Sequence, residues 1–346
     1  MTGNTNGGSH QGDPQLILLI KSANGAYIAG TDGNAVRSYG QWFDRLLQSG
    51  ESGDEDTITG LVLYADLLES LKFPEKADCM RSIAYGSVLQ NYTPSPDEIT
   101  WAAQAIAASA VRRPTIGLRT AAEKLLALLA EVPGNTPGTL IAQKADAYGA
   151  YLLVLLNLNE VKTARSVYAR YSGEFTARTD NTKDSGLITI AQAQLRESLG
   201  DVRSAEVLFT APIRPSSSIP GANSFATGMA HPDGDFPAIR RQVGLIRAAA
   251  AFYQRRHRCR ELAGFVDRYA ASWQIGPYLG EPARLYTDAA QCFQAAQDSS
   301  GAETMISRLR DRIRDEISAR AVSGQYFQGG ATPTRISSRR RTRSFP

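Results

Sequence analysis

Two eleven-residue segments of this chain are near copies of each other, and they limit its fold more than any other feature. The first begins at Leu158 and ends at Tyr168; the second begins at Leu199 and ends at Phe209, so they lie 41 residues apart. Leucine, acidic, valine, basic, alanine and aromatic side chains recur at corresponding positions. Each segment has the pattern of a turn followed by the start of a helix, as in a helical hairpin. A repeat at this period predicts a row of stacked supersecondary units.

Small side chains extend the pattern along the chain, because two helices of a hairpin approach closely only where side chains are small. Alanine on a predicted first helix is followed twelve residues later by alanine on the second at five places, and the unit around Ala164 has Leu152 in the earlier position. An alanine-rich helical chain produces such pairs by chance, but five in order, each across a predicted turn, favour a repeat. The pairs are Ala65 and Ala77, Ala110 and Ala122, Ala193 and Ala205, Ala251 and Ala263, and Ala290 and Ala302.

These units resemble the tetratricopeptide repeat, in which a small residue of one helix packs on an alanine of the next. The residues that match best are Ala193, Gly200, Ala205 and Phe209, and then Tyr286, Ala289, Ala290, Phe293 and Ala302. The resemblance covers roughly residues 58–318, although the units exceed the usual repeat of about 34 residues and lack its regular tryptophan and proline. It implies an all-α fold, a right-handed α-solenoid of about six helical hairpins that binds a partner on its concave face.

The repeats are expected to occupy residues 57–321, after an N-terminal part of different character. Residues 1–14 have almost nothing to bury and are predicted to form a disordered arm. Residues 15–56 are predicted to hold a small β-hairpin and a capping helix, because Asn24-Gly25 is a strong hairpin turn signal between two short apolar runs.

Two further segments interrupt or follow the repeats. Residues 211–237 contain five prolines and three consecutive serines and have no helical period. This insertion is either a loop on the binding face or a disordered linker. Residues 322–346 are predicted to form a disordered, arginine-rich tail.

The charge is distributed unevenly. Residues 201–346 carry 21 bases, all of them arginine, against 13 acids, which favours an anionic partner for this half. The candidate phosphate-binding residues are Arg240, Arg241, Arg247, Arg255 and Arg256 in the fifth unit and Arg339, Arg340 and Arg341 in the tail. The alternative for the fifth unit is a solvated arginine face over an aromatic core.

The sequence contains no recognisable catalytic or cofactor-binding motif, so we expect no enzymatic activity and no cofactor. The three cysteines have no metal-ligand spacing and no disulfide framework, and the three histidines have no such spacing either. Cys79 and Cys292 fall at helical core positions and are expected to be buried free thiols.

No apolar run approaches the roughly 18 residues that predict a membrane span, and no signal peptide is recognised. We therefore expect no membrane partner and a cytoplasmic protein.

Two hypotheses for function follow. The first is a non-catalytic scaffold or adaptor that binds a protein or peptide. The second is an RNA-coating viral nucleoprotein that self-assembles through its terminal arms, located in the virion and in the host cytoplasm or nucleus. The sequence His231-Pro-Asp233, Phe236-Pro237 and residues 249–253 are similar to segments of nucleoproteins of some negative-strand RNA viruses.

Overall fold

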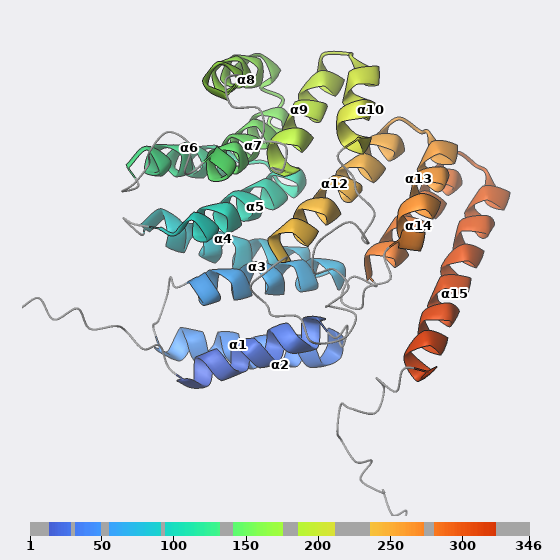
Figure 1. Ribbon diagram of the computed structural model, residues 1–346, viewed down its shortest axis with the longest axis horizontal. Helices are drawn as coiled ribbons and strands as arrows, with labels where there is room; N and C mark the ends of the chain where they lie inside the picture. Colours follow the sequence, from blue (N-terminus) through green and yellow to red (C-terminus); the bar gives the residue numbers. More distant parts are fainter. Residues whose placement is uncertain are drawn as a thin grey trace, which may run out of the picture.

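The computed structural model describes residues 14–28, 32–49, 55–90, 94–131, 141–175, 186–211, 236–272 and 280–322. Within these ranges the chain forms fourteen α-helices and no strand, so the predicted all-α class is confirmed (Figure 1). The first seven helices are α1 (Pro14–Ile28), α2 (Asp32–Ser49), α3 (Glu55–Ser70), α4 (Pro74–Gln90), α5 (Pro96–Arg112), α6 (Ile116–Glu131) and α7 (Ile141–Asn157). The others are α8 (Val161–Phe175), α9 (Gly186–Ser198), α10 (Val202–Thr210), α12 (Phe236–Arg255), α13 (Cys259–Ser272), α14 (Gly280–Ala295) and α15 (Ser299–Val322).

The helices are arranged as consecutive hairpins. Helices α3, α5, α7, α9, α12 and α14 each begin a hairpin, and each packs against the next in this series. The hairpins follow one another in an arc from α1 and α2 to α15, with α7 and α14 toward its inside and α8 and α15 toward its outside (Figure 1). This is the stacked arrangement that the repeat predicts.

From α3 onward, the two helices of every hairpin are joined by a three-residue turn. In five of these six turns the middle residue has a positive φ, between 54° and 84°. Its N–H donates to the carbonyl three residues earlier, and the next N–H donates to the carbonyl five residues before it, as in the Schellman motif. The middle residues are Lys72, Asn159, Gly200, His257 and Gln297.

The turn between α5 and α6 departs from this rule. Its middle residue is Pro114, whose ring fixes φ near −65° and which has no N–H to donate. The helix instead ends with a bond from the Arg113 N–H to the carbonyl of Ser109, at 2.9 Å. The Thr115 hydroxyl then accepts the N–H of Leu118 at 3.2 Å and caps α6.

The predicted N-terminal β-hairpin is wrong, because residues 14–28 form helix α1. Leu16, Ile20 and Ala23 are buried, and their spacing of four and three residues places them on one helical face. Asn24, predicted as a turn residue, lies within the helix and accepts a hydrogen bond from the Tyr39 hydroxyl at 2.7 Å. Packing against α2 and α3 therefore outweighs the local turn preference of Asn24-Gly25.

The alanine spacing identifies the hairpins correctly in most units. Both alanines of four of the five predicted pairs are buried, as are Leu152 and Ala164. In the fifth hairpin Ala251 and Ala263 are only half-buried. The hydrogen bond that opens the second helix runs from Leu262 to the carbonyl of Arg258. Leu262 therefore occupies the position that the second alanine has in the other hairpins, and the pair predicted for the fifth hairpin is one residue out of register.

Two central helices have almost no free surface. Between residues 98 and 110 of α5, all side chains are buried except the half-buried Gln104 and Ala108. Between residues 145 and 155 of α7, only Tyr148 is half-buried. Gly149 permits this packing, because a Cβ atom there would lie 2.6 Å from the backbone of Leu187 and Ile188 in α9. The backbones of α7 and α9 can approach this closely only with glycine at position 149.

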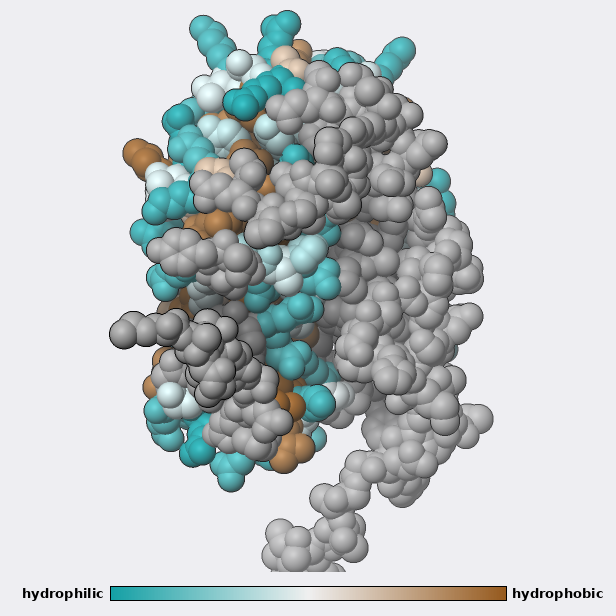
Figure 2. All heavy atoms as spheres, turned by 60° about the vertical axis from the view of Figure 1, so that its left-hand side comes forward, coloured by the Kyte–Doolittle hydropathy of each residue, from teal (hydrophilic) through white to brown (hydrophobic). Residues whose placement is uncertain are grey.

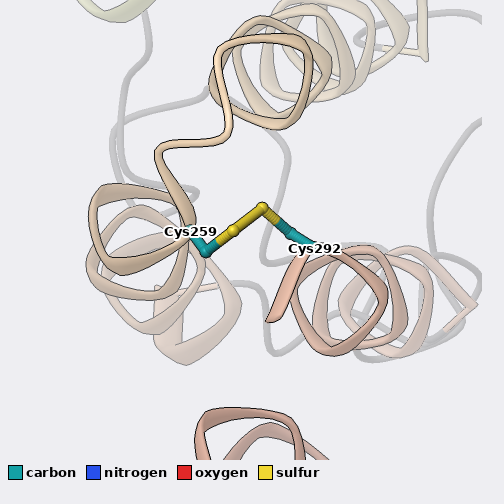
Figure 3. The surroundings of a disulfide bond; sticks show 2 residues. All are labelled: Cys259 and Cys292. Carbon is teal, nitrogen blue, oxygen red and sulfur yellow. A yellow bond between two sulfur atoms is a disulfide. The ribbon is translucent and has the colours of Figure 1, made fainter. Parts of the chain in front are cut away.

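The expectation of free thiols at Cys79 and Cys292 is wrong in two respects. Cys292 in α14 forms a disulfide with Cys259 at the start of α13, with the Cα atoms 5.5 Å apart (Figure 3). Cys79 is free but exposed. The disulfide could not be predicted from the sequence, because the cysteines are 33 residues apart and meet only when the last two hairpins stack.

Some predictions lie outside the described residues. These concern the disordered arm at residues 1–13, the tail at residues 323–346, and most of the insertion, residues 212–235.

Candidate interaction surface

Three arginines of the fifth hairpin, Arg255, Arg256 and Arg258, lie at its junction with the fourth. Arg255 and Arg256, at the end of α12, share the carboxylate of Glu197, near the end of α9. The Arg255 Nη2 to Glu197 Oε2 distance is 2.7 Å, and the Arg256 Nε to Oε1 distance is 3.2 Å. Both oxygens of Glu197 are thus engaged.

Arg258, in the turn after α12, makes the more extensive set of contacts. Its guanidinium donates to both oxygens of Glu206 in α10, at 2.7 and 3.1 Å, and to Glu261 at 2.9 Å. It also lies 5.2 Å from the ring centre of Tyr253, whose hydroxyl donates to Glu206. These bonds lower the pKa of Glu206, chiefly through Arg258. Burial, followed by the hydrogen bond to Glu206, raises the pKa of Tyr253 to about 12.

The structure therefore places two of the eight predicted phosphate-binding arginines, Arg255 and Arg256, in ion pairs with a neighbouring hairpin. Arg247 lies half-buried in α12 and also has an interaction partner. Arg240 and Arg241 belong to α12, but their side chains are outside the described part of the chain, as are Arg339, Arg340 and Arg341.

Similar polar contacts join every consecutive pair of hairpins from α3–α4 onward. Exposed ion pairs contribute little to stability, so these contacts mark where one hairpin meets the next. The contacts are Arg112 with Asp78, Arg119 with Glu160, Gln192 with Tyr168, Arg255 with Glu197, and Arg308 with Asp267.

A different surface lies along the turns of the hairpins α3–α4 and α5–α6. Phe73, Val111 and Ile116 are 50%, 60% and 76% exposed, and we call these three residues the turn-edge patch. The ion pair between Arg112 and Asp78, at 2.8 Å, joins the end of α5 to the first turns of α4 and so brings the two turns together. The patch is therefore contributed by two neighbouring hairpins.

The charges around the turn-edge patch are mainly positive. Lys72 and Arg113 in the two turns and Lys76 in the first turn of α4 are exposed, as is the acid Glu75 beside Lys76. The Lys76 ammonium lies 5.4 Å from the ring centre of Phe73, in cation–π geometry. The surface thus combines apolar side chains with a positive rim.

Sequence reasoning assigned no role to this patch. Its one sequence signal is that Val111 and Ile116 flank the dipeptide Arg113-Pro114, where a loop normally carries polar residues. The extent of their exposure depends on how the hairpins stack. On the face shown in Figure 2, hydrophobic residues form small separate groups among hydrophilic ones.

No protein-family model matches the chain, and no curated protein matches it. Among the residues described, no three histidine, cysteine or acidic side chains are grouped so that they could hold a metal ion. The described helices include none with the length and apolar character needed to cross a membrane.

Proposed function

We propose that this protein is a non-catalytic, tetratricopeptide-like scaffold, a right-handed α-solenoid that binds a protein or peptide partner. The observation that carries the proposal is the turn-edge patch. Large apolar side chains that are at least half exposed on two adjacent hairpins mark an interaction surface, since single exposed residues are common but groups of them are not.

The partner binds at the turn edge, which revises the expectation of binding on the concave face. The inner helices α5 and α7 expose very few side chains along their central turns, so they offer little to contact. Phe73, Val111 and Ile116, in contrast, project from the stack and are reachable without any rearrangement.

The chemistry of the surface selects a partner segment that is both apolar and acidic. Three exposed bases and one exposed acid lie close in sequence to the residues of the patch, and Lys76 lies over the Phe73 ring. A carboxylate placed among Lys72, Lys76 and Arg113 gains attraction that speeds association, while apolar side chains bury Ile116 and Val111.

The alternative proposal is an RNA-coating nucleoprotein, and two of the arginines on which it rests, Arg255 and Arg256, form ion pairs between hairpins. Arg255, Arg256 and Arg258 are each paired with glutamate. A phosphate would have to displace these carboxylates, which are already held in charge-assisted hydrogen bonds. A protein partner requires no such exchange.

The test is site-specific photo-crosslinking in cells that naturally contain the protein. Benzoylphenylalanine replaces Ile116 in one sample and Leu47 in the control, because Leu47 is an equally apolar, 65% exposed residue of α2. We expect one protein to be captured at position 116 and not at position 47, through a segment rich in acidic and apolar residues.

Two further measurements complete the test. The variant Val111→Asp with Ile116→Asp should weaken binding of the captured segment at least tenfold, whereas Leu47→Asp should not. Equal capture at both positions, or a basic captured segment, would refute the proposal. Co-purification with RNA that is released by salt would favour the nucleoprotein alternative instead.

A further inference from the structure

The disulfide between Cys259 and Cys292 joins two different hairpins. Cys259 is the first residue of α13, and Cys292 lies in the last part of α14. Figure 3 shows the bond spanning the gap between these two helices. Both cysteines are buried, with 6% and 3% of their surface exposed. A dissolved reductant therefore reaches the sulfur atoms only when the two hairpins separate.

The bond lies at one end of the described stack. The hairpin α14–α15 is the last one described and packs on a neighbour on one side only. Among the described side chains of α15, only Ala302 and Met305 are buried. The ion pair between Arg308 and Asp267 is largely exposed and contributes little. A terminal repeat of this kind opens more easily than the repeats inside the stack.

We propose that the Cys259–Cys292 bond is a permanent structural cross-link, formed in a compartment where thiols are oxidised, that keeps the last hairpin docked on the stack. A cross-link restricts the unfolded chain and so favours the docked state. Disulfides of this structural kind persist in oxidising compartments and are rare where cellular thiols are kept reduced. The cross-link thus favours an oxidising compartment over the cytoplasm expected from the sequence.

Formation of the bond follows ordinary thiol–disulfide exchange. One cysteine thiolate attacks the disulfide of a thiol oxidoreductase, forms a mixed disulfide and releases one oxidoreductase thiolate. The second cysteine, as its thiolate, then attacks the mixed disulfide and releases the second oxidoreductase thiolate. The two cysteines lose two electrons and two protons in total, and the oxidoreductase disulfide is reduced to two thiols.

The first test measures the state of the thiols where the protein occurs. Source cells are quenched with acid, the protein is unfolded in a maleimide reagent with or without prior reduction, and the mass of the full chain is measured. The exposed Cys79 is a built-in control, because it should react in either case. We expect one label per chain without reduction and three when the protein is reduced first. Three labels without reduction would overturn the proposal.

The second test measures what the bond holds in place. Hydrogen exchange of α14 and α15 is compared between the natural chain and the variant Cys259→Ser with Cys292→Ser, with Cys79→Ser as the matched control. We expect exchange in these two helices to become about a hundredfold faster in the double variant and to stay unchanged in the control. The same comparison on the natural chain, with and without a phosphine reductant, avoids any effect of the serines. Unchanged exchange in both comparisons would contradict the proposal.

Discussion

The turn around Gly200 and the turn around Pro114 join their helices over the same number of residues by different means. At Gly200 the backbone enters the left-handed region, with φ at 84°, and two hydrogen bonds close the helix end. At Pro114 that conformation is unavailable, and a single bond from Arg113 ends the helix. The residues that flank Pro114, Val111 and Ile116, are the most exposed members of the turn-edge patch. The one turn that departs from the repeat thus carries the candidate binding surface.

The largest effect is expected when the central glycine of one turn is replaced by the proline of the other. Gly200→Pro places a ring at a positive φ and removes the N–H that bonds Glu197. We expect the free energy of unfolding to fall by about 3 kcal/mol or more. Urea denaturation followed by circular dichroism measures it. A loss below about 1 kcal/mol would show that the left-handed turn is not required.

A milder substitution isolates the backbone conformation from the hydrogen bond. Gly200→Ala keeps the N–H and meets no atom within 4 Å, so its cost comes only from the positive φ. We expect a loss of about 1 kcal/mol. Gly264→Ala in α13 is the matched control, because its Cβ also meets nothing within 4 Å but its backbone is helical. The control should gain about 0.5 kcal/mol. Equal effects of the two variants would contradict the argument.

The reciprocal exchange has a smaller effect. Pro114→Gly frees the unfolded chain and is expected to lower the free energy of unfolding by about 0.5 to 1 kcal/mol. Thermal unfolding and partner binding are measured together. Weaker binding without a larger loss of stability would show that the proline serves to present Val111 and Ile116. A gain in stability would mean that the second hairpin adopts the left-handed turn when it is allowed to.

The caps of the two turns differ in their response to acid. Asp201 caps α10 by accepting the Ser204 N–H, and the pKa of its carboxyl is lowered by the Ser204 side chain first and by this backbone bond second. A lowered folded-state pKa means that the stabilisation is present above the unfolded pKa, near 4, and is lost as pH falls through the folded value. We expect the Ser204 amide to lose protection in that acidic range. The Leu118 amide, capped by the uncharged Thr115, should show no matching step in an NMR titration.

Much of the fold could be predicted because the repeat is a local property of the sequence. The small residues Ala65 and Ala77, or Ala193 and Ala205, report directly on where two helices of one hairpin touch. The turn predicted at Asn24 is wrong for the opposite reason, since its helix forms through burial of Leu16 and Ile20 against distant residues. Local preference and distant packing disagree there, and packing prevails.

The candidate interaction surface could be predicted less well from the sequence than the hairpins could. Arg255 and Glu197 are 58 residues apart, and nothing in their local sequence shows that they pair. The same holds for the disulfide and for the exposure of Ile116, which depend on the order and register of stacked hairpins. Contacts between neighbouring repeats therefore need the structure, whereas contacts within a repeat do not.

The cross-link also has a mechanical consequence. If the protein were pulled from its two ends, the segment between Cys259 and Cys292, which are 33 positions apart, could not extend, because the bond bypasses it. At roughly 3.5 Å per extended residue, the oxidised chain would stretch about 110 Å less than the reduced one. Hairpins before α12 would unravel to their full length, while the segment between the two sulfur atoms would carry no tension.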